Sequence, residues 1–424
     1  MNKQEIAIIG GGVAGLTSAY LLSKDHQITL FEANDYIGGH TNTITIPSGP
    51  DAGLAVDTGF IVCTLANYPN FCKLLDKLNV PLQDSDMSFS YHQMHPTPFY
   101  YSSDFPKGLF AQYRHIFSPN YWRFLADIFA FNRQAIEDLN HKKLGQRSLI
   151  EYLHSHKYSE SFIRHYVLPM GAAIWSASFE EIKQFPAQTF IQFWANHGLL
   201  QVTGRPQWKT VKGGSKTYVT AILKQIEGLY RTSSPIASIS RAQDGVIITD
   251  HHGVMHHFDQ VIIATHADQA YRLLADPTPQ ETALLGPWKY SKNTTTLHTD
   301  PVLMPPHHKI WASWNYLNTS TFESESPIFL SYYMNRLQNL QTKTNYFVTL
   351  NAPSDIAVDP AKIIKQMTYT HPIFSFEALQ TQPQLSTLNG KQNTYFCGSY
   401  FGYGFHEDAV KSAINVVTQL GVEW

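Results

Sequence analysis

The sequence of 424 residues has only three cysteines, no long apolar run and no cluster of basic residues. Cys63, Cys72 and Cys397 are odd in number and scattered, which disfavours a disulfide framework and fits a reducing cytoplasm. No apolar stretch approaches the roughly 18 residues of a membrane-spanning helix, and the first strand starts too early to leave room for a signal peptide. A net charge of −2 without a basic run gives no indication of nucleic-acid binding. We therefore expect a cytoplasmic protein that binds no nucleic acid.

Spacings typical of metal ligands are also lacking, although the chain has 20 histidines. His251-His252 and His256-His257 flank a predicted hairpin turn, and adjacent residues of a strand point to opposite faces. Each pair therefore offers a site one ligand at most, and zinc sites usually have ligands at other spacings. We expect exposed histidines here and no bound metal.

What the chain does have is a strand–turn–helix unit at its start that is typical of dinucleotide binding. An apolar strand over 3–9 breaks at Gly10, and Gly10, Gly12 and Gly15 occupy the G-x-G-x-x-G positions before a helical pattern. A second strand over 27–31 ends at Glu32, the acid expected about 20 residues on to bond a ribose hydroxyl. The candidate contacts in this unit are Gly10, Gly12, Val13, Ala14, Gly15, Glu32 and Ala33.

The kind of dinucleotide follows from Glu32 and from a second glycine pair. An acid at this position disfavours NADP and leaves FAD or NAD. Gly38-Gly39 come soon after it, where an extended FAD needs backbone close by and a nicotinamide cofactor does not. No second G-x-G-x-x-G follows a later strand, so a separate NADPH domain is not expected. FAD is the predicted cofactor.

The rest of the chain predicts an α/β flavoprotein (α+β in its two-domain layout) with interleaved domains. A Rossmann-like FAD-binding domain is expected from 1–80, 205–285 and 385–424, and a substrate domain from 81–204 and 286–384, with a helical part over 105–200 and an antiparallel sheet over 290–351. In the helical part, Ser118 can cap a helix in which Trp122, Leu125 and Phe129 recur at helical spacing. This stripe predicts a lid or membrane-contacting surface, or a face packed inward, and we favour inward packing for most of it.

Motifs along the whole chain are similar to those of the FAD-dependent amine oxidase superfamily. They include the segment 169–176, Gly213-Gly214-Ser215 and the C-terminal segment 396–409. Within the superfamily the chain most resembles a bacterial group of NAD/FAD-binding oxidoreductases encoded beside cyclopropane-fatty-acyl-phospholipid synthases. The resemblance implies non-covalently bound FAD and the cofactor positions Gly38, Gly39, His40, Thr41, Ile236, Ala264, Gly398, Ser399, Phe405, His406 and Ala409. His40 stands where the superfamily has an arginine.

A flavoprotein of this kind takes a hydride from a C–H bond to the flavin, so its residues must hold a substrate and exclude water. The candidates for the catalytic site are His406, Tyr316, Tyr333 and Trp314, and none is identified as a base. Lys292 is the nearest candidate for the flavin-facing lysine of amine oxidases. Arg205 and Arg336 are candidates for binding a carboxylate or phosphate head group, or for structural ion pairs.

Three functions remain open at this point. We favour oxidation or desaturation of an apolar substrate, such as a fatty acyl chain of a lipid, with peripheral contact at the inner membrane face. The first alternative is a flavin-containing amine oxidase that releases hydrogen peroxide. The second is a non-catalytic, FAD-bound partner of a lipid-modifying methyltransferase.

Overall fold

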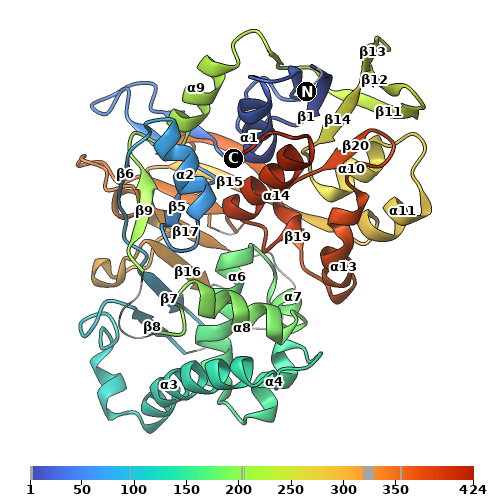
Figure 1. Ribbon diagram of the computed structural model, residues 1–424. Coiled ribbons are helices and arrows are strands. Elements are labelled where there is room, and N and C mark those ends of the chain that lie inside the picture. The colour runs from blue at the N-terminus through green and yellow to red at the C-terminus, as the bar shows by residue number, and fades with distance from the viewer. Residues whose placement is uncertain (1–2, 96, 202–203, 205, 319–328, 354–355) are drawn as a thin grey trace.

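Five parallel strands form one sheet of the molecule (Figure 1). The computed structural model describes residues 3–95, 97–201, 204, 206–318, 329–353 and 356–424, so that Arg205 lies outside the described residues. Across the sheet the strands are β10 (Tyr230–Arg231), β2 (Gln27–Phe31), β1 (Glu5–Ile9), β14 (Gln260–Ile263) and β20 (Thr394–Phe396). All neighbouring pairs are parallel, and the short apolar runs are buried on both faces, as a parallel sheet requires.

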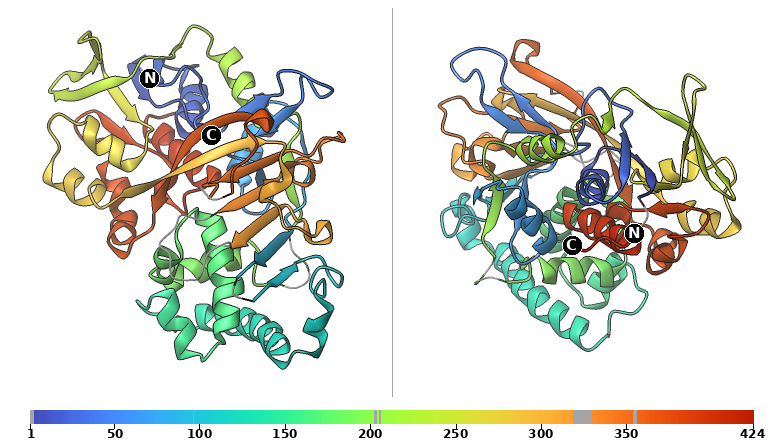
Figure 2. Two further views of the ribbon diagram at one scale, coloured as in Figure 1. Left: turned by 180° about the vertical axis from the view of Figure 1, so that it is seen from behind. Right: turned by 45° about the horizontal axis from the view of Figure 1, so that its top comes forward.

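Different layers cover the two faces of this sheet. Because side chains alternate along a strand, Ile6 and Ile8 pack against α1 (Val13–Leu22) and α14 (His406–Gln419). Ala7 and Ile9 point the other way, toward an antiparallel sheet of β11 (Ile236–Ala242), β12 (Gly245–Asp250) and β13 (Met255–Phe258). The two further views in Figure 2 also show α1 (dark blue) and α14 (dark red) side by side. The fold is thus the Rossmann-like arrangement expected at the start of the chain.

A second, seven-stranded sheet extends beyond the predicted range 290–351. Its order is β19 (Ile363–Ile373), β15 (Lys289–His298), β18 (Phe347–Leu350), β17 (Leu330–Tyr333), β16 (Trp314–Asn318), β7 (Phe89–Gln93) and β8 (Phe99–Ser102). Within 290–351 the strand pairs are antiparallel as expected, and the one parallel pair among the sheet's described strands joins β16 to β7, which comes from an earlier part of the chain. We missed β19, since this edge strand is half-exposed and carries Pro372, which only an edge tolerates.

The helical part packs against this second sheet (Figure 1). It comprises η1 (Tyr113–Phe117), α3 (Pro119–Asn140), α4 (Leu149–Ser155), α5 (Glu160–Phe162), η2 (Ile163–Val167), α6 (Leu168–Trp175), α7 (Phe179–Lys183) and α8 (Ala187–Asn196). The Ser118 side chain caps α3 as predicted, by accepting from the Tyr121 amide. Inward packing of the stripe is wrong for two of its members, because Trp122 and Phe129 are 50% and 58% exposed. Helix α3 carries apolar side chains on two neighbouring faces. Tyr121 and Phe124 lie on the buried face, whereas Trp122 and Phe129 lie on the exposed one.

Smaller elements join the two main sheets. Strand β6 (Leu82–Asp84), from the segment expected in the substrate domain, pairs with β9 (Trp208–Val211), which also pairs with β5 (Val62–Thr64). The remaining strands and α-helices are β3 (Thr43–Thr45), β4 (Ala55–Asp57), α2 (Pro69–Lys77), α9 (Lys216–Gln225), α10 (Ala267–Leu273), α11 (Pro279–Leu285), α12 (Met334–Leu337) and α13 (Phe376–Thr381). Short turns of 3-10 helix are η3 (Pro301–Leu303), η4 (His308–Ile310), η5 (Pro360–Lys362), η6 (Gln382–Leu388) and η7 (Ser399–Phe401). None of the described helices is long and apolar enough to cross a membrane.

Candidate active site

A cavity of about 1140 Å³ joins the carboxyl edge of the parallel sheet to the helical part. It exceeds the roughly 300–1,000 Å³ of ordinary small-molecule pockets, which leaves space for a dinucleotide and a second ligand. One end is lined by the turns that follow β1, β2, β14 and β20, where ligands bind in open α/β sheets. The other end is lined by aromatic side chains of the second sheet and of α6 and α8.

The glycines after β1 have different physical tasks. A Cβ on Gly10 would lie 2.8 Å from the Ala264 carbonyl oxygen, and one on Gly15 would lie 1.9 Å from the Gly10 carbonyl oxygen. Those two positions therefore exclude a side chain because the protein itself is packed there. A Cβ on Gly12 would meet nothing within 4 Å, and Gly12 lines the cavity. Its missing side chain leaves room for a ligand to approach the peptide, as a pyrophosphate at a helix N-terminus requires.

Glu32 lies at the same edge, at the end of β2. The buried carboxylate accepts hydrogen bonds from the amide of Gly11 (2.7 Å) and from the amide of Asn34 (2.8 Å), which ties two turns together beside the cavity. Oε1 also accepts from the side-chain amide of Asn34 at 2.7 Å, so Oε2 is the oxygen that retains a lone pair and can accept from a ribose hydroxyl. The residues present thus fit the nucleotide half of a flavin.

Three histidines meet where the second glycine pair enters the cavity. The His40 ring lies 5.3 Å from that of His371 and 6.1 Å from that of His266, and it stacks on Tyr369 at 5.1 Å. Burial, helped by the neighbouring His266, lowers the pKa of His40 to about 4, so its ring is neutral at pH 7. Its buried Nε2 finds no partner among the residues that the structure describes. His40 therefore supplies no positive charge at this position.

His406 starts α14, whose N-terminus faces the cavity. Its ring stacks on Phe60 with centroids 3.6 Å apart, and its Nε2 lies 3.0 Å from the Thr41 hydroxyl and 3.2 Å from that of Tyr218. Burial, with a smaller effect of His40, lowers the pKa of His406 to about 3. The ring is thus neutral and held by two hydroxyls, which makes it a structural support for the helix end. The backbone N–H groups of that end can face an anionic flavin edge.

Nearly all predicted cofactor positions come together in this cavity. The lining includes Gly10, Gly12, Val13, Ala14, Glu32, Ala33, Gly38, Gly39, His40, Ile236, Ala264, Gly398, Ser399, Phe405, His406 and Ala409. Gly15 and Thr41 do not line it: Gly15 serves helix packing, and Thr41 reaches the site through His406.

The predicted catalytic side chains are only partly brought together. Trp314 lines the cavity, but Tyr316 packs between Tyr91 and Phe179 behind it. Tyr333 is also outside, because alternation along β17 turns it toward Phe347, and its hydroxyl donates to Asn345. Its neighbour Tyr332 lines the cavity instead, directly opposite Trp314 in the pairing of β16 and β17, with the two rings 5.1 Å apart.

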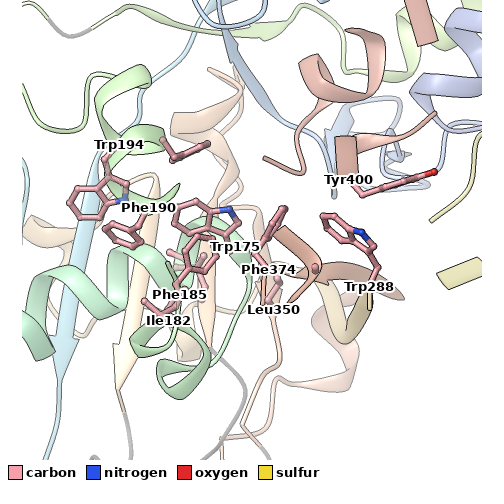
Figure 3. Packing of buried hydrophobic residues seen from close by; sticks show 14 of the residues in the cluster. Trp175, Ile182, Phe185, Phe190, Trp194, Trp288, Leu350, Phe374 and Tyr400 are labelled. Carbon is pink, nitrogen blue, oxygen red and sulfur yellow. The ribbon is translucent and has the colours of Figure 1, made fainter. Parts of the chain in front are cut away.

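The aromatic end contains residues that the sequence did not single out. Trp175 and Trp194 come from α6 and α8, and Figure 3 shows them in a band of rings that continues to Phe374. The indole N–H groups of Trp175, Trp194 and Trp314 are buried, and none has an acceptor in the described part of the chain. Trp175 lies within the segment 169–176, which is one of the motifs similar to the superfamily. The resemblance gave this side chain no role in the site.

Charged groups are scarce at the aromatic end. Asp86 lines it, but its carboxylate pairs with Arg336 at 2.8 Å and accepts from the Ser313 hydroxyl. Burial acts to raise the pKa of Asp86, yet hydrogen bonds from Ser313 and Ser88 lower it overall, so the pair stays ionised. Arg336 also binds Asp104, so it is occupied within the protein and does not fit the predicted head-group role. Lys292 is exposed, and no lysine of the described residues lines the cavity.

Within the described residues, no group of three or more His, Cys, Asp or Glu side chains is placed to hold a metal ion. The pairs at His251-His252 and His256-His257 lie in the β12–β13 hairpin, with His251 in its turn and His256 beside Asp250.

The comparison with known proteins agrees with this geometry. The family described as flavin containing amine oxidoreductase matches residues 13–302. The chain belongs to this family. Membership implies a flavin cofactor and an oxidoreductase class, in keeping with a cavity that fits the nucleotide half of a flavin.

Other similarities are to a curated relative and to solved structures. A 1-hydroxycarotenoid 3,4-desaturase of Flavobacterium sp. (strain P99-3) is 35% identical over 85 residues, which cover 20% of this chain and 15% of the desaturase. The curated relatives that match are aligned over only 7–15% of their length. Putrescine oxidase bound to putrescine superposes with a TM-score of 0.70 at 12% identity, over 99% of both chains. A CLA-producing fatty acid isomerase from P. acnes gives a TM-score of 0.65 at 14% identity, again over 99% of both. These structural similarities establish the fold.

Proposed function

We propose that this flavin containing amine oxidoreductase family member holds FAD non-covalently and oxidises or desaturates an apolar substrate, such as a fatty acyl chain of a lipid. Desaturation removes one hydrogen as a hydride, which the bound flavin would accept, and the neighbouring hydrogen as a proton. Reoxidation of the flavin then needs an acceptor such as oxygen or a quinone. The residues of this chain bind and orient the substrate and keep water out of the cavity.

Several observations support FAD held without a covalent bond. The open space at Gly12 and the carboxylate of Glu32 suit its pyrophosphate and ribose, and the N-terminus of α14 suits the flavin ring. None of the cysteines, all of which are described and buried, lines the cavity, so no thiol is placed to attach the flavin. Acid precipitation of the purified protein should therefore leave the flavin in the supernatant. Flavin that stays with the pellet would contradict non-covalent binding.

The observation that carries the choice of substrate is the set of unpaired indole N–H groups. Trp175, Trp194 and Trp314 line this end, and each has a buried indole N–H without an acceptor in the described residues, which costs about 1–3 kcal/mol. A ligand whose acceptor oxygens come within hydrogen-bond distance of these groups would remove this cost. A carboxyl or ester group at the head of an acyl chain does so, whereas an ammonium group is itself only a donor.

The charges at this end support the same choice. An amine substrate brings a cation into the cavity, and burying a cation is costly unless an anion pairs with it. The nearest carboxylate, Asp86, is already neutralised by Arg336. A neutral or acceptor-bearing apolar substrate needs no such partner. The fold itself accommodates both kinds of ligand, since it is shared by proteins described as a putrescine oxidase and as a fatty acid isomerase.

The test is anaerobic bleaching of the purified holoenzyme. We expect an acyl lipid dispersed in detergent to reduce the flavin, and mass spectrometry to find an added double bond or an oxidised product. Trp175→Phe should raise the KM for that lipid, because it removes one donor while keeping an aromatic ring. Trp288→Phe is the matched control, since the Trp288 indole donates to Thr381 away from the cavity.

Other outcomes would redirect the proposal. Bleaching by putrescine or an arylalkylamine with release of peroxide on admitting air, and none by lipids, would favour an amine oxidase. No bleaching by any compound, together with capture of a lipid-modifying methyltransferase, would favour a scaffold role. Either result would reject an acyl-chain reaction.

A further inference from the structure

An exposed aromatic patch covers one end of the helical part. Six large apolar side chains form it: Phe105, Tyr113, Ile116, Phe117, Trp122 and Phe129. Phe117 is 85% exposed, and Phe105 and Tyr113 are each 79% exposed. Most of the strongly exposed large apolar side chains of the described residues fall within these 25 consecutive positions, 105–129. Soluble proteins rarely expose apolar side chains together without a ligand for them.

Contacts within the segment make this patch one surface. The indole of Trp122 donates to the Ile116 carbonyl oxygen at 2.8 Å, which fixes η1 against the first turns of α3. The ring of Phe110 lies 5.8 Å from that of Trp122, and the Phe110 amide donates to the Pro106 carbonyl oxygen, which connects the loop at Phe105. Phe129 follows Trp122 by two helical turns, so it lies on the same face of α3.

Basic side chains predominate among the charges of the patch. Residues 105–129 contain Lys107, Arg114 and Arg123 and a single acidic residue, Asp127, in a chain with a net charge of −2. All three basic side chains are exposed. Arg123 pairs with Asp127 at 3.3 Å, whereas Lys107 and Arg114 have no ion-pair partner in the described ranges. The segment thus combines exposed aromatic rings with uncompensated positive charge.

The patch is also continuous with the aromatic end of the cavity. Tyr101 and Ser103 line that end, and the patch begins two residues later at Phe105. Asp104, between them, is held by Arg336. The chain therefore runs directly from the cavity wall to the exposed patch.

We propose that the aromatic patch docks on the surface of a bilayer that contains anionic phospholipids. Aromatic rings with flanking Lys and Arg are the composition that binds at the interface between head groups and acyl chains. The rings enter the interface, and the basic side chains attract the anionic head groups. Docking does not depend on the proposed reaction, although it would deliver a lipid substrate to it.

The test is co-sedimentation of the FAD-loaded full chain with vesicles. Vesicles of equal amounts of phosphatidylcholine and phosphatidylglycerol should bind the protein, and vesicles of phosphatidylcholine alone should bind it less. The double variant Phe105→Ser/Phe117→Ser should lose at least about tenfold in affinity, because two large apolar side chains no longer enter the interface. Lys107→Gln/Arg114→Gln should lose about fivefold for each charge and bind with less dependence on salt.

A matched control lies at the opposite end of the molecule (Figures 1 and 2). Val254→Ser/Met255→Ser removes two exposed apolar side chains from the β12–β13 hairpin and should bind vesicles like the natural chain. Thermal melting and flavin content of each variant establish that it is folded. The proposal is overturned if the natural chain does not bind the anionic vesicles at low salt, or if the phenylalanine variant binds them equally well. It is also overturned if sedimentation velocity shows the patch joining two copies of the chain and vesicles bind neither form. Flavin bleaching by lipid dispersed in detergent tests the reaction separately.

Discussion

A side chain at Gly12 should affect cofactor binding and leave the fold intact. Its backbone is in an ordinary extended conformation, with φ −72° and ψ 179°, which alanine also adopts. A Cβ there would meet no atom within 4 Å, and the free space belongs to the cavity. We therefore predict that Gly12→Ala folds normally and binds FAD weakly.

The magnitudes can be worked out for both states. In the apoprotein, alanine is a poorer N-cap than glycine by about 1 kcal/mol. Replacing glycine also restricts the unfolded chain and regains about 0.4–1 kcal/mol, so the free energy of unfolding should change by less than about 1 kcal/mol. In the complex, a methyl group forced against a tightly packed neighbour costs about 1–3 kcal/mol. The dissociation constant for FAD should rise by about 5- to 150-fold.

Calorimetric titration of apoprotein with FAD, paired with urea unfolding of the apoprotein, measures both quantities. Gly15→Ala is the informative contrast, because its Cβ would lie 1.9 Å from the backbone oxygen of Gly10. That variant should lose about 3 kcal/mol or more of stability before any ligand is added. Unchanged FAD affinity in a folded Gly12→Ala protein would refute the placement of the pyrophosphate over this turn.

Three further changes test Glu32 and His406 at the site and the buried Asp57, which lies outside the cavity lining. Glu32→Gln should weaken FAD binding by about tenfold in the same titration. The reason is that one oxygen, which in Glu32 accepts from the Gly11 or Asn34 amide, is replaced by an NH₂ donor. Equal affinity would exclude this carboxylate from ribose binding. Asp57→Ala should lower the free energy of unfolding by about 3 kcal/mol in urea, since the fully buried carboxylate accepts several hydrogen bonds; a loss below about 1 kcal/mol would contradict this role. Burial lowers the pKa of His406 to about 3, so its stabilising contribution is complete above the unfolded value of about 6.5 and is lost as the pH falls toward 3. Between pH 7 and pH 5 the free energy of unfolding should fall by about 2 kcal/mol through this group, and His406→Gln should remove that part of the pH dependence. An identical pH dependence in the variant would show that the imidazole is not buried in its neutral form.

The nucleotide-binding end of the cavity could be predicted because its residues are determined by the local backbone geometry of one strand–turn–helix unit. The strand ending at Gly10, the helix after Gly12 and the acid at Glu32 are linked through short stretches of chain, and their spacing in sequence determines their spacing in the fold. The same holds for the Ser118 cap of α3. Local geometry of this kind depends little on what packs around it.

The substrate end could not be assigned from the sequence with equal success, because it depends on register and on distant segments. Tyr332 rather than Tyr333 faces the cavity, and one step along β17 decides which. Trp194 reaches the same cavity from α8, and only tertiary packing brings it there. His371 lies on β19, an edge strand whose polar, half-exposed sequence lacks the apolar run of a central strand.

The departure at His40 changes how this cavity can hold an anionic cofactor. Burial keeps the His40 ring neutral, and the single arginine among the described lining residues, Arg272, is mostly exposed and paired with Asp268. The remaining positive ends are the peptide N–H groups at the starts of α1 and α14. Peptide dipoles act strongly only at hydrogen-bond distance, so the anion must approach the backbone closely. That requirement explains why Gly12 has open space beside it.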